Sequence, residues 1–158
     1  RGYLMVYKAV SDKNQMPFGG PVVHCVATSD SPTGPFKKHP HPVFTKDGVA
    51  FPAEDPFVWH DGKRYRAIVK DNGGHFTNAG KGLVLFESAD GFDWKLSAQP
   101  LLTTPEIAWT NGVKQKLYSL ERPQLWFEKG QPAVLLGAAD LSPAREHSYN
   151  VQIPLKAR

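Results

Sequence analysis

The feature that most constrains the fold is a repeated segment in which an acidic tripeptide ending in proline leads into a short apolar run. Glu54-Asp55-Pro56 precedes one such run, and Glu121-Arg122-Pro123 precedes another. Each run is followed by a polar turn containing glycine, Asp61-Gly62 in the first case and Lys129-Gly130 in the second, and then by another apolar run. A chain that repeats such a unit is built from similar small sheets stacked in series.

Short predicted strands fill most of the chain. Runs rich in aliphatic and aromatic residues alternate with clusters of Gly, Pro, Asn and Asp, which favour turns. They lie at residues 3–9, 22–28, 57–60, 64–70, 83–88, 92–96, 124–127, 133–137 and 148–156. No long stretch has a helical period, although residues 105–109 could form one helical turn. The sequence therefore predicts an all-β protein.

A second repeat sets the size of the unit. Residues 27–36 align with residues 87–94, and the two repeats together give a unit of about sixty residues, somewhat longer than the common propeller repeats. We expect a β-propeller of which this chain supplies about three blades: a blade tail (1–46), a complete blade (47–103) and a further blade (117–158). Because three blades do not close a ring, we expect the chain to be a piece of a longer protein, namely its C-terminal part.

Charge and composition exclude several classes of function. The chain carries 19 Lys+Arg against 15 Asp+Glu, and this excess is spread along the sequence, which argues against a nucleic-acid partner. No apolar run approaches the roughly 18 residues of a membrane-spanning helix, so no membrane partner is expected. The single cysteine, Cys25, rules out an internal disulfide and a cysteine-based metal cluster. His24 and Cys25 alternate in a strand, and we expect Cys25 to be a buried small apolar residue.

The quoted motifs resemble those of the five-bladed propeller glycosidases, above all glycoside hydrolase family 43 and its relatives. Residues 28–36 look like the turn between the third and fourth strands of a blade there. Glu54-Asp55-Pro56 resembles an innermost strand, and Glu121-Arg122-Pro123 resembles the segment that carries the general acid. The resemblance implies hydrolysis of a glycosidic bond in a polysaccharide or oligosaccharide by paired carboxylates.

The resemblance also implies roles for individual carboxylates. Glu121 falls on the general acid, and Asp55 falls on the aspartate that raises the acid's pKa by like-charge repulsion. The general base would then lie in a blade before Arg1, outside this chain. Arg122 departs from the family pattern, which has Gly or Cys there, and a guanidinium beside the acid would lower its pKa. If Arg122 pairs with Glu121, the carboxylate becomes an acceptor for sugar hydroxyls.

Three further residues are candidates for sugar binding, together with Arg122. The polar segment 70–82 is longer than a minimal hairpin, and such loops commonly hold functional groups, so we expect His75 or Asn72 to contact the sugar. Trp109, in the segment 103–116, is the best candidate for stacking on a sugar ring. We expect no cofactor and see no clustered metal ligands. Some relatives in these glycosidase families hold a calcium ion near the propeller axis, so we leave open whether this chain holds a structural calcium ion.

Two alternatives remain beside the hydrolase. One is a non-catalytic carbohydrate-binding propeller, and the other is a protein-interaction propeller. The two acidic motifs and the polar loop favour a sugar over a protein ligand. Carboxylates that converge in one pocket would favour the enzyme, whereas carboxylates buried in separate ion pairs would favour the binder. The expected partners are a carbohydrate and either the remaining blades or a second copy of the chain, and the substrate class favours a secreted or periplasmic location.

Overall fold

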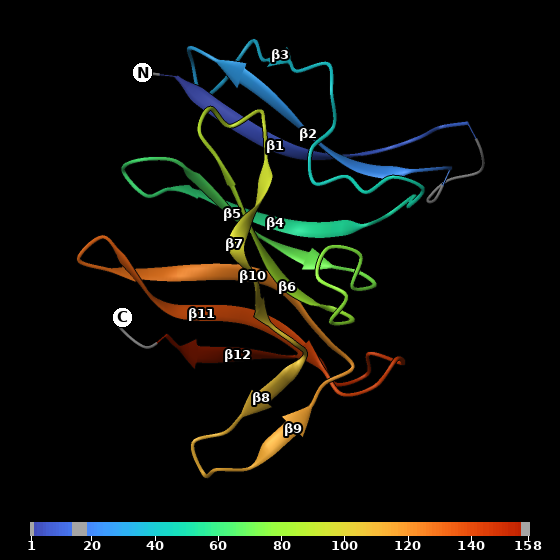
Figure 1. The fold of residues 1–158 in the computed structure, drawn as a ribbon, viewed down its shortest axis with the longest axis vertical. Coiled ribbons are helices and arrows are strands. Elements are labelled where there is room, and N and C mark those ends of the chain that lie inside the picture. The colour runs from blue at the N-terminus through green and yellow to red at the C-terminus, as the bar shows by residue number, and fades with distance from the viewer. Residues whose placement is uncertain (1, 14–18, 156–158) are drawn as a thin grey trace.

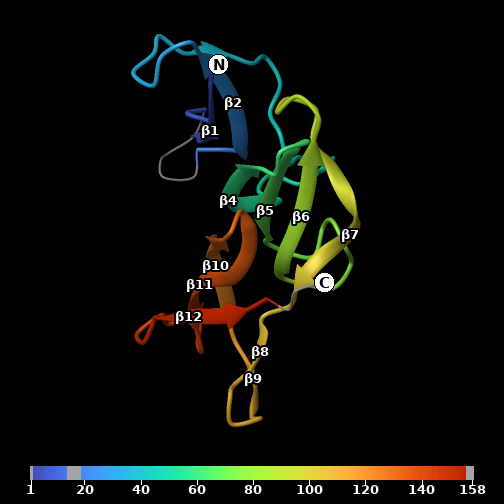
Figure 2. The same cartoon turned by 90° about the vertical axis from the view of Figure 1, so that its left-hand side faces the viewer.

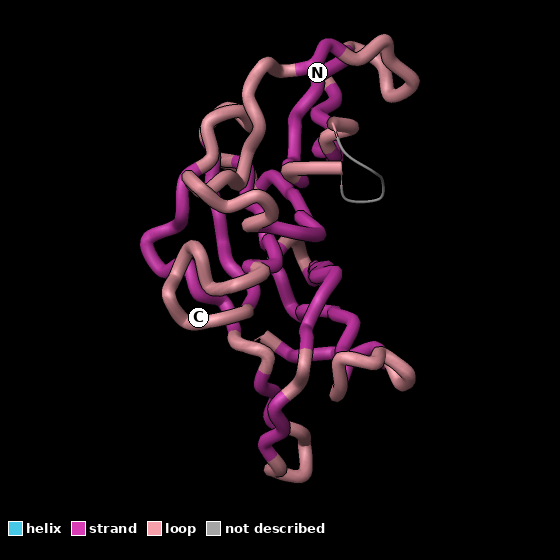
Figure 3. The backbone as a smooth tube through the Cα atoms, turned by 90° about the vertical axis from the view of Figure 1, so that its right-hand side faces the viewer, coloured by secondary structure: helices cyan, strands magenta, loops and turns pink. Residues whose placement is uncertain are grey.

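The computed structural model describes residues 2–13 and 19–155, and within them it contains strands and loops but no helix (Figure 3). The strands are β1 (Tyr3–Val10), β2 (Val22–Ser29), β3 (Lys37–Lys38), β4 (Ala53–His60), β5 (Tyr65–Asp71), β6 (Gly82–Ser88), β7 (Lys95–Thr103), β8 (Glu106–Ala108), β9 (Lys114–Lys116), β10 (Ser119–Glu128), β11 (Gln131–Asp140) and β12 (Tyr149–Pro154). The all-β prediction is confirmed. A membrane-crossing helix is accordingly missing from this part of the chain.

The strands form three antiparallel sheets and a separate hairpin. The sheet orders are β1-β2-β3, β4-β5-β6-β7 and β10-β11-β12, with β8 and β9 paired alone. The sheets follow one another along the long axis of the molecule, and the β8–β9 hairpin projects beyond the third (Figures 1 and 2). Strand β10, at the edge of its sheet, lies against β4 and β5 of the middle sheet. Sheets made of sequentially adjacent antiparallel strands and stacked face to face are the arrangement of propeller blades.

The middle sheet is buried on both faces, which explains why its central strands read as continuous apolar runs rather than alternating ones. In β5, Ala67 and Val69 point into a core shared with the first sheet, while Ile68 points into a core shared with the third. In β6, Val84 points into the core shared with the first sheet, and Leu83 points into the core shared with the third. Because side chains alternate along a strand, each apolar run serves two neighbours. The middle sheet therefore holds the other two sheets together.

The two acidic tripeptides produce the same local distortion. The pairing of β4 with β5 shifts register between Glu54 and Phe57, and the pairing of β10 with β11 shifts between Glu121 and Gln124. Proline has no N–H to donate to a ladder, so strands that contain it commonly bulge there. The repeat read from the sequence thus corresponds to a β-bulge repeated in two sheets.

Some predicted segments differ from the observed ones. Residues 105–109 enter strand β8 instead of a helical turn, because β8 pairs with β9 to close a hairpin. The strand expected at 92–96 begins only at Lys95, since residues 90–93 form a turn around Asp90, whose carboxylate accepts the N–H groups of Phe92 and Asp93. Arg1 and residues 156–158, which belong to the first and last predicted blades, lie outside the described residues.

The expectation that Cys25 is buried is wrong. His24 is 2% exposed, whereas Cys25 is only partly buried. In β2 the inward positions include Val22, His24 and Val26, and the His24 ring packs 6.3 Å from the ring of Phe44. The strand register, rather than side-chain polarity, decides which of the two neighbours enters the core.

Burial of His24 predicts a specific dependence of stability on pH. Burial lowers the pKa of His24 from 6.5 to about 4, and the charge of Lys8 acts in the same direction, against that of Glu54. Between these values the unfolded chain binds a proton that the folded chain does not, so the free energy of unfolding falls as the pH drops from 6.5 to 4. The expected loss from this group is on the order of 3 kcal/mol.

Urea unfolding of the full chain at several pH values measures this loss. His24→Leu should remove it, and His41→Leu, which changes an exposed histidine, should keep it. Equal losses in the His24 variant and the unaltered protein would contradict the assignment.

Candidate functional site

Five charged side chains from all three sheets form one continuous chain of ion pairs. Lys8 Nζ donates to Glu54 Oε1 at 2.9 Å, and Lys70 Nζ donates to Glu54 Oε2 at 3.2 Å. Lys70 Nζ also donates to Glu121 Oε1 at 2.6 Å, and Arg145 Nη2 donates to the same oxygen at 2.6 Å. We call this set the ion-pair chain. It links β1, β4, β5, β10 and the loop that precedes β12.

The strand pattern explains why these groups meet. In β5, Lys70 lies two residues after Ile68 and therefore on the face that packs against the third sheet. Strand β10 lies against that face and contributes Glu121. Glu54 and Glu121 occupy equivalent positions at the two bulges, so the repeat itself places a carboxylate on either side of Lys70.

Glu121 is an ionised carboxylate in this arrangement. Its side chain is 8% exposed and that of Lys70 is 10% exposed. Burial by itself raises the pKa of Glu121, but the hydrogen bonds and charges of Lys70 and Arg145 outweigh burial and hold the pKa below its usual value. Lys8 and Lys70 lower the pKa of Glu54 in the same way, again against the effect of burial. Both glutamates are therefore hydrogen-bond acceptors near neutral pH.

Asp55 lies near the same charged groups, but its pKa shifts in the opposite direction, upward. Burial raises its pKa, and the negative charge of Glu54 adds to this, while Lys8, Lys70 and Arg122 act against it. Neighbouring carboxyls whose pKa values are pushed apart are typical of acid–base pairs in active sites. Of these three carboxyls, Glu54 and Glu121 have lowered pKa values and Asp55 has a raised one.

The residues after the two glutamates adopt a strained backbone. Asp55 has φ 50° and Arg122 has φ 51°, both in the left-handed region. This conformation costs a non-glycine residue roughly 1–2 kcal/mol, and such outliers cluster at functional sites. The ion pairs of Glu121 are with Lys70 and Arg145, not with the exposed Arg122. The lowered pKa expected from an adjacent arginine is therefore present, but two other cations cause it.

The predicted polar loop is organised by a buried carboxylate that directly follows Lys70. Asp71 is fully buried and accepts backbone N–H groups of His75 at 2.8 Å, Phe76 at 3.0 Å and Gly73 at 3.4 Å. The Asn72 amide donates to the carbonyl of Phe51 at 3.2 Å. Residues 72–76 are therefore fixed to the end of β5 and to the segment before β4. His75 is half-buried within this fixed part.

Trp109 belongs to a different part of the molecule. Its indole Nε1 donates to Gln115 Oε1 at 2.7 Å across the turn between β8 and β9, and its ring stacks on Tyr149 at 6.3 Å. The side chain is still 37% exposed. The described contacts of Trp109 are thus with the hairpin and β12, and the ion-pair chain is not among them.

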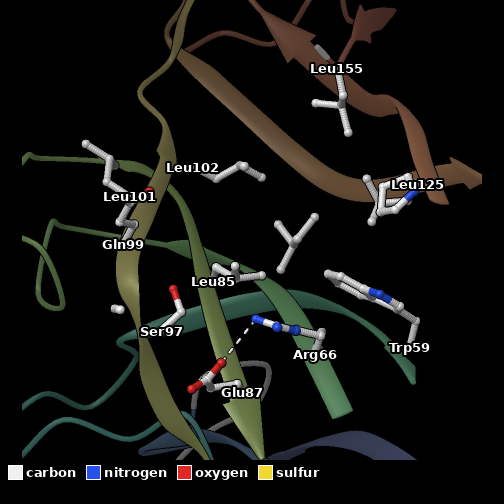
Figure 4. A pocket seen from close by; sticks show the side chains of 13 residues that line it. Trp59, Arg66, Leu85, Glu87, Ser97, Gln99, Leu101, Leu102, Leu125 and Leu155 are labelled. Atoms are coloured by element: carbon white, nitrogen blue, oxygen red, sulfur yellow. Dashed lines mark hydrogen bonds and ion pairs between the residues drawn. The ribbon is translucent and has the colours of Figure 1, made fainter. Parts of the chain in front are cut away.

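An apolar groove of about 620 Å³ opens between the middle and third sheets (Figure 4). Trp59, Leu85 and Leu125 line it, and Arg66 crosses one side to pair with Glu87 at 3.1 Å. Neither Glu121 nor Asp55 is among its lining residues. Among residues 2–13 and 19–155, no group of three His, Cys, Asp or Glu side chains is arranged to hold a metal ion.

Sequence reasoning missed the three cations of the ion-pair chain. Lys70 had a visible signal, because a lysine that directly follows the apolar run 67–69 in the same strand must either reach the surface or meet a buried carboxylate. Lys8 and Arg145 had none, because each is an ordinary basic residue in a strand or a loop. Their role depends on which side chains meet where neighbouring sheets pack, and the sequence repeats do not give those contacts.

Comparison with solved structures identifies the fold. The chain is similar to the glycoside hydrolase family 32 β-fructofuranosidase BmSUC1 of Bombyx mori, with a TM-score of 0.54 and 16% identity, over 96% of this chain and 31% of that one. A mutant of the same enzyme in complex with sucrose gives a TM-score of 0.53 and 17% identity over the same shares. No family model matches the chain, and no curated protein matches it. The fold is that of a partial β-propeller of the kind found in five-bladed glycosidases.

The expected relationship to propeller glycosidases is therefore confirmed at the level of the fold. The neighbours belong to family 32 rather than family 43, and the chain spans about a third of their length.

The ion-pair chain predicts that Lys70 is essential for stability. Lys70→Met should lower the free energy of unfolding by close to 3 kcal/mol, the low end of about 3–5 kcal/mol for breaking a buried pair, because Lys8 and Arg145 still neutralise one carboxylate each. Urea unfolding of the full chain at pH 7 measures the change. Lys63→Met, at an exposed lysine, should cost less than about 0.5 kcal/mol. Equal losses in the two variants would contradict this role, and adding Glu121→Gln to Lys70→Met should restore part of the stability.

Proposed function

We propose that this chain is part of a glycoside hydrolase-like propeller that cleaves a glycosidic bond with paired carboxylates, Glu121 and Asp55. The observation that carries the proposal is the pair of acidic bulges on neighbouring strands β4 and β10, joined through Lys70. The similarity in fold to glycosidases supports it. Such hydrolysis needs one carboxyl that donates a proton and one that stays ionised. In the ligand-free site the pKa of Asp55 is raised and that of Glu121 is lowered, so the ligand has to reverse this order for Glu121 to act as the acid.

We assign the roles as follows. Glu121, in its protonated form, donates a proton to the glycosidic oxygen while the bond from that oxygen to the sugar carbon breaks. Asp55 adjusts the charge felt by Glu121, and a carboxylate base in another part of the complete protein activates the attacking water. In the ligand-free site Glu121 is held ionised by Lys70 and Arg145. It therefore becomes an acid only when these counterions are weakened.

We further propose that Arg122, His75, Asn72 and Trp109 bind the carbohydrate. The exposed Arg122 follows Glu121 directly and interacts electrostatically with Asp55. His75 and Asn72 lie in the fixed segment that begins one residue after Asp71, and Trp109 offers a partly exposed aromatic face on the outer hairpin. Trp109 would then bind a more distant part of a long substrate.

A non-catalytic carbohydrate-binding propeller is the second candidate. The two ion pairs on Glu121 favour it, because an ionised carboxylate accepts hydrogen bonds from sugar hydroxyls but cannot donate a proton. Against it, Glu54 and Glu121 share Lys70 instead of lying in separate ion pairs. Turnover of a substrate distinguishes the two functions.

We propose that residues 1–46, 47–103 and 117–158 each contribute to a separate blade and that the remaining blades, or a second copy, cover the open first sheet. Tyr3 is 47% exposed and Met5 is 38% exposed on strand β1. Large apolar side chains exposed side by side on a strand commonly mark a contact surface.

Replacing the proposed acid tests the catalytic function. Glu121→Gln in the complete protein should lower kcat by a factor of roughly 10²–10⁴ with binding retained, because an amide cannot donate the proton. The loss of kcat should be smaller for aryl glycosides with good leaving groups, because such a group departs without being protonated. Glu87→Gln is the matched control, because Glu87 also pairs with two cations, Arg64 and Arg66, outside the site. Unchanged turnover in the Glu121 variant would refute the assignment.

Replacing His75 tests the proposed binding loop. His75→Ala removes a side chain but leaves the backbone N–H that Asp71 accepts. We expect KM to rise several-fold, as for loss of one hydrogen bond to the ligand, with little change in unfolding. His41→Ala serves as the control. An unaltered KM together with an unaltered kcat would remove His75 from the site.

A further inference from the structure

We infer that the ligand of this site is an acidic sugar, one that carries a carboxylate or sulfate group, and that Arg145 is the residue that binds this group. The inference rests on the proposed function, because it names the class of carbohydrate that the same site would take.

The first observation is that the ion-pair chain ends in a cation on both sides. Its interior members, Lys70 and Glu121, are 10% and 8% exposed, whereas the outer members, Lys8 and Arg145, are 41% and 48% exposed. The side chains of the two outer cations are therefore more accessible to a ligand than those of the interior pair. A ligand that reaches the chain meets positive charge first.

The second observation is the balance of charge. Lys8, Lys70 and Arg145 contribute three positive charges, and Glu54 and Glu121 contribute two negative ones, so the chain of five residues has a net charge of +1. Arg122, Asp55 and Asp140 lie near these groups, and with them the four cations and four carboxylates balance. An oxyanion would therefore be attracted by the local positive charge of the exposed Arg145, not by an excess of charge over the whole site.

The third observation is that the pairing of Arg145 is redundant. Lys70 and Arg145 donate to the same oxygen, Oε1 of Glu121, so Glu121 keeps one cationic partner when Arg145 binds a ligand. Arg145 lies in the loop between β11 and β12 and has φ 55°, a left-handed conformation that an arginine adopts only at a cost. Its guanidinium uses one N–H group on Glu121 and has others that can bind an oxyanion.

An acidic ligand would also change the state of Glu121. The charged groups around this carboxylate come from three parts of the chain. Lys70, Glu54 and Asp55 belong to the middle sheet, Arg145 lies in the loop with Asp140 near it, and Arg122 is the next residue. An oxyanion paired with Arg145 cancels one of the two cations that keep Glu121 ionised. The pKa of Glu121 then rises toward the range in which a carboxyl can donate a proton.

The proposed step balances as an ordinary hydrolysis. Protonated Glu121 gives its proton to the glycosidic oxygen, which takes the electron pair of the breaking bond to the sugar carbon. Water forms the new bond to that carbon and loses a proton to the base carboxylate. The ligand's anionic group does not react and is present before and after the step.

The test compares paired substrates in the complete protein. Aryl glycosides of glucuronate and galacturonate are set against those of glucose and galactose, and a sulfated galactoside forms a separate arm that distinguishes sulfate from carboxylate. Arg145→Gln is compared with Arg64→Gln, since Arg64 has a similar exposure of 45% and also pairs with a glutamate, Glu87. Binding is measured by calorimetry and turnover as a function of pH.

We expect acidic substrates to bind more tightly than neutral ones and Arg145→Gln to reduce that preference about 10- to 100-fold, as for loss of one charge-assisted hydrogen bond. With neutral substrates the same variant should move the alkaline limb of the pH–rate profile to higher pH. Arg64→Gln should do neither. Equal binding of acidic and neutral sugars, or a preference that Arg145→Gln leaves unchanged, would overturn the inference.

The two proposals fail in different ways. Turnover of neutral substrates that is lost in Glu121→Gln, with no preference for acidic ones, would keep the hydrolase and overturn the acidic ligand. Tight binding of acidic sugars that depends on Arg145, without turnover, would keep the acidic ligand and support the carbohydrate-binding alternative. Absence of binding to any of these sugars would overturn both.

Discussion

The shared hydrogen bonds of one lysine hold the charged centre of this protein together. Lys70 Nζ contacts Glu54 on the same sheet and Glu121 on the next, and it is nearly buried while doing so. A buried ammonium is tolerated only when its donors are satisfied by acceptors of opposite charge. The packing of β10 against the middle sheet and the ionised state of Glu121 therefore depend on each other. A sheet that moved would leave three charges in a poorly hydrated interior.

The two repeated bulges show how a sheet can display charge without losing its core. Regular alternation would send successive side chains to opposite faces, one of them apolar. The Glu-X-Pro bulge interrupts that rule, so Glu54 and Glu121 join the ion-pair chain while Asp55 and Arg122 adopt left-handed backbones beside them. Ala53 and Leu120, the residues just before the two glutamates, are each buried in one of the two cores, and this packing offsets the backbone strain.

The sequence predicts the strands well because their signals are local. Turns rich in Gly, Pro and Asp, together with the repeat of Glu54-Asp55-Pro56 in Glu121-Arg122-Pro123, define the sheets and their order. Local signals do not predict the features that depend on contacts between segments far apart in the sequence. The inward position of His24 follows from strand register, and the partners of Glu121 follow from the meeting of separate sheets. The motifs point to Glu121, but only the packing reveals which cations hold it ionised.

The anchoring of the polar loop by Asp71 has a consequence for how such a protein can diversify. The Asp71 carboxylate, at the end of β5, accepts the N–H groups that shape residues 73–76. Residues 78–80, later in the same loop, are exposed. Asp71 shapes the first half of the loop directly, and the second half is attached to it by the hydrogen bond from the Asn78 N–H to the Gly74 carbonyl, at 2.9 Å. Lengthening or exchanging the exposed half leaves the Asp71 hydrogen bonds intact, so new recognition elements can be grafted there without redesigning the strand that supports the charged centre.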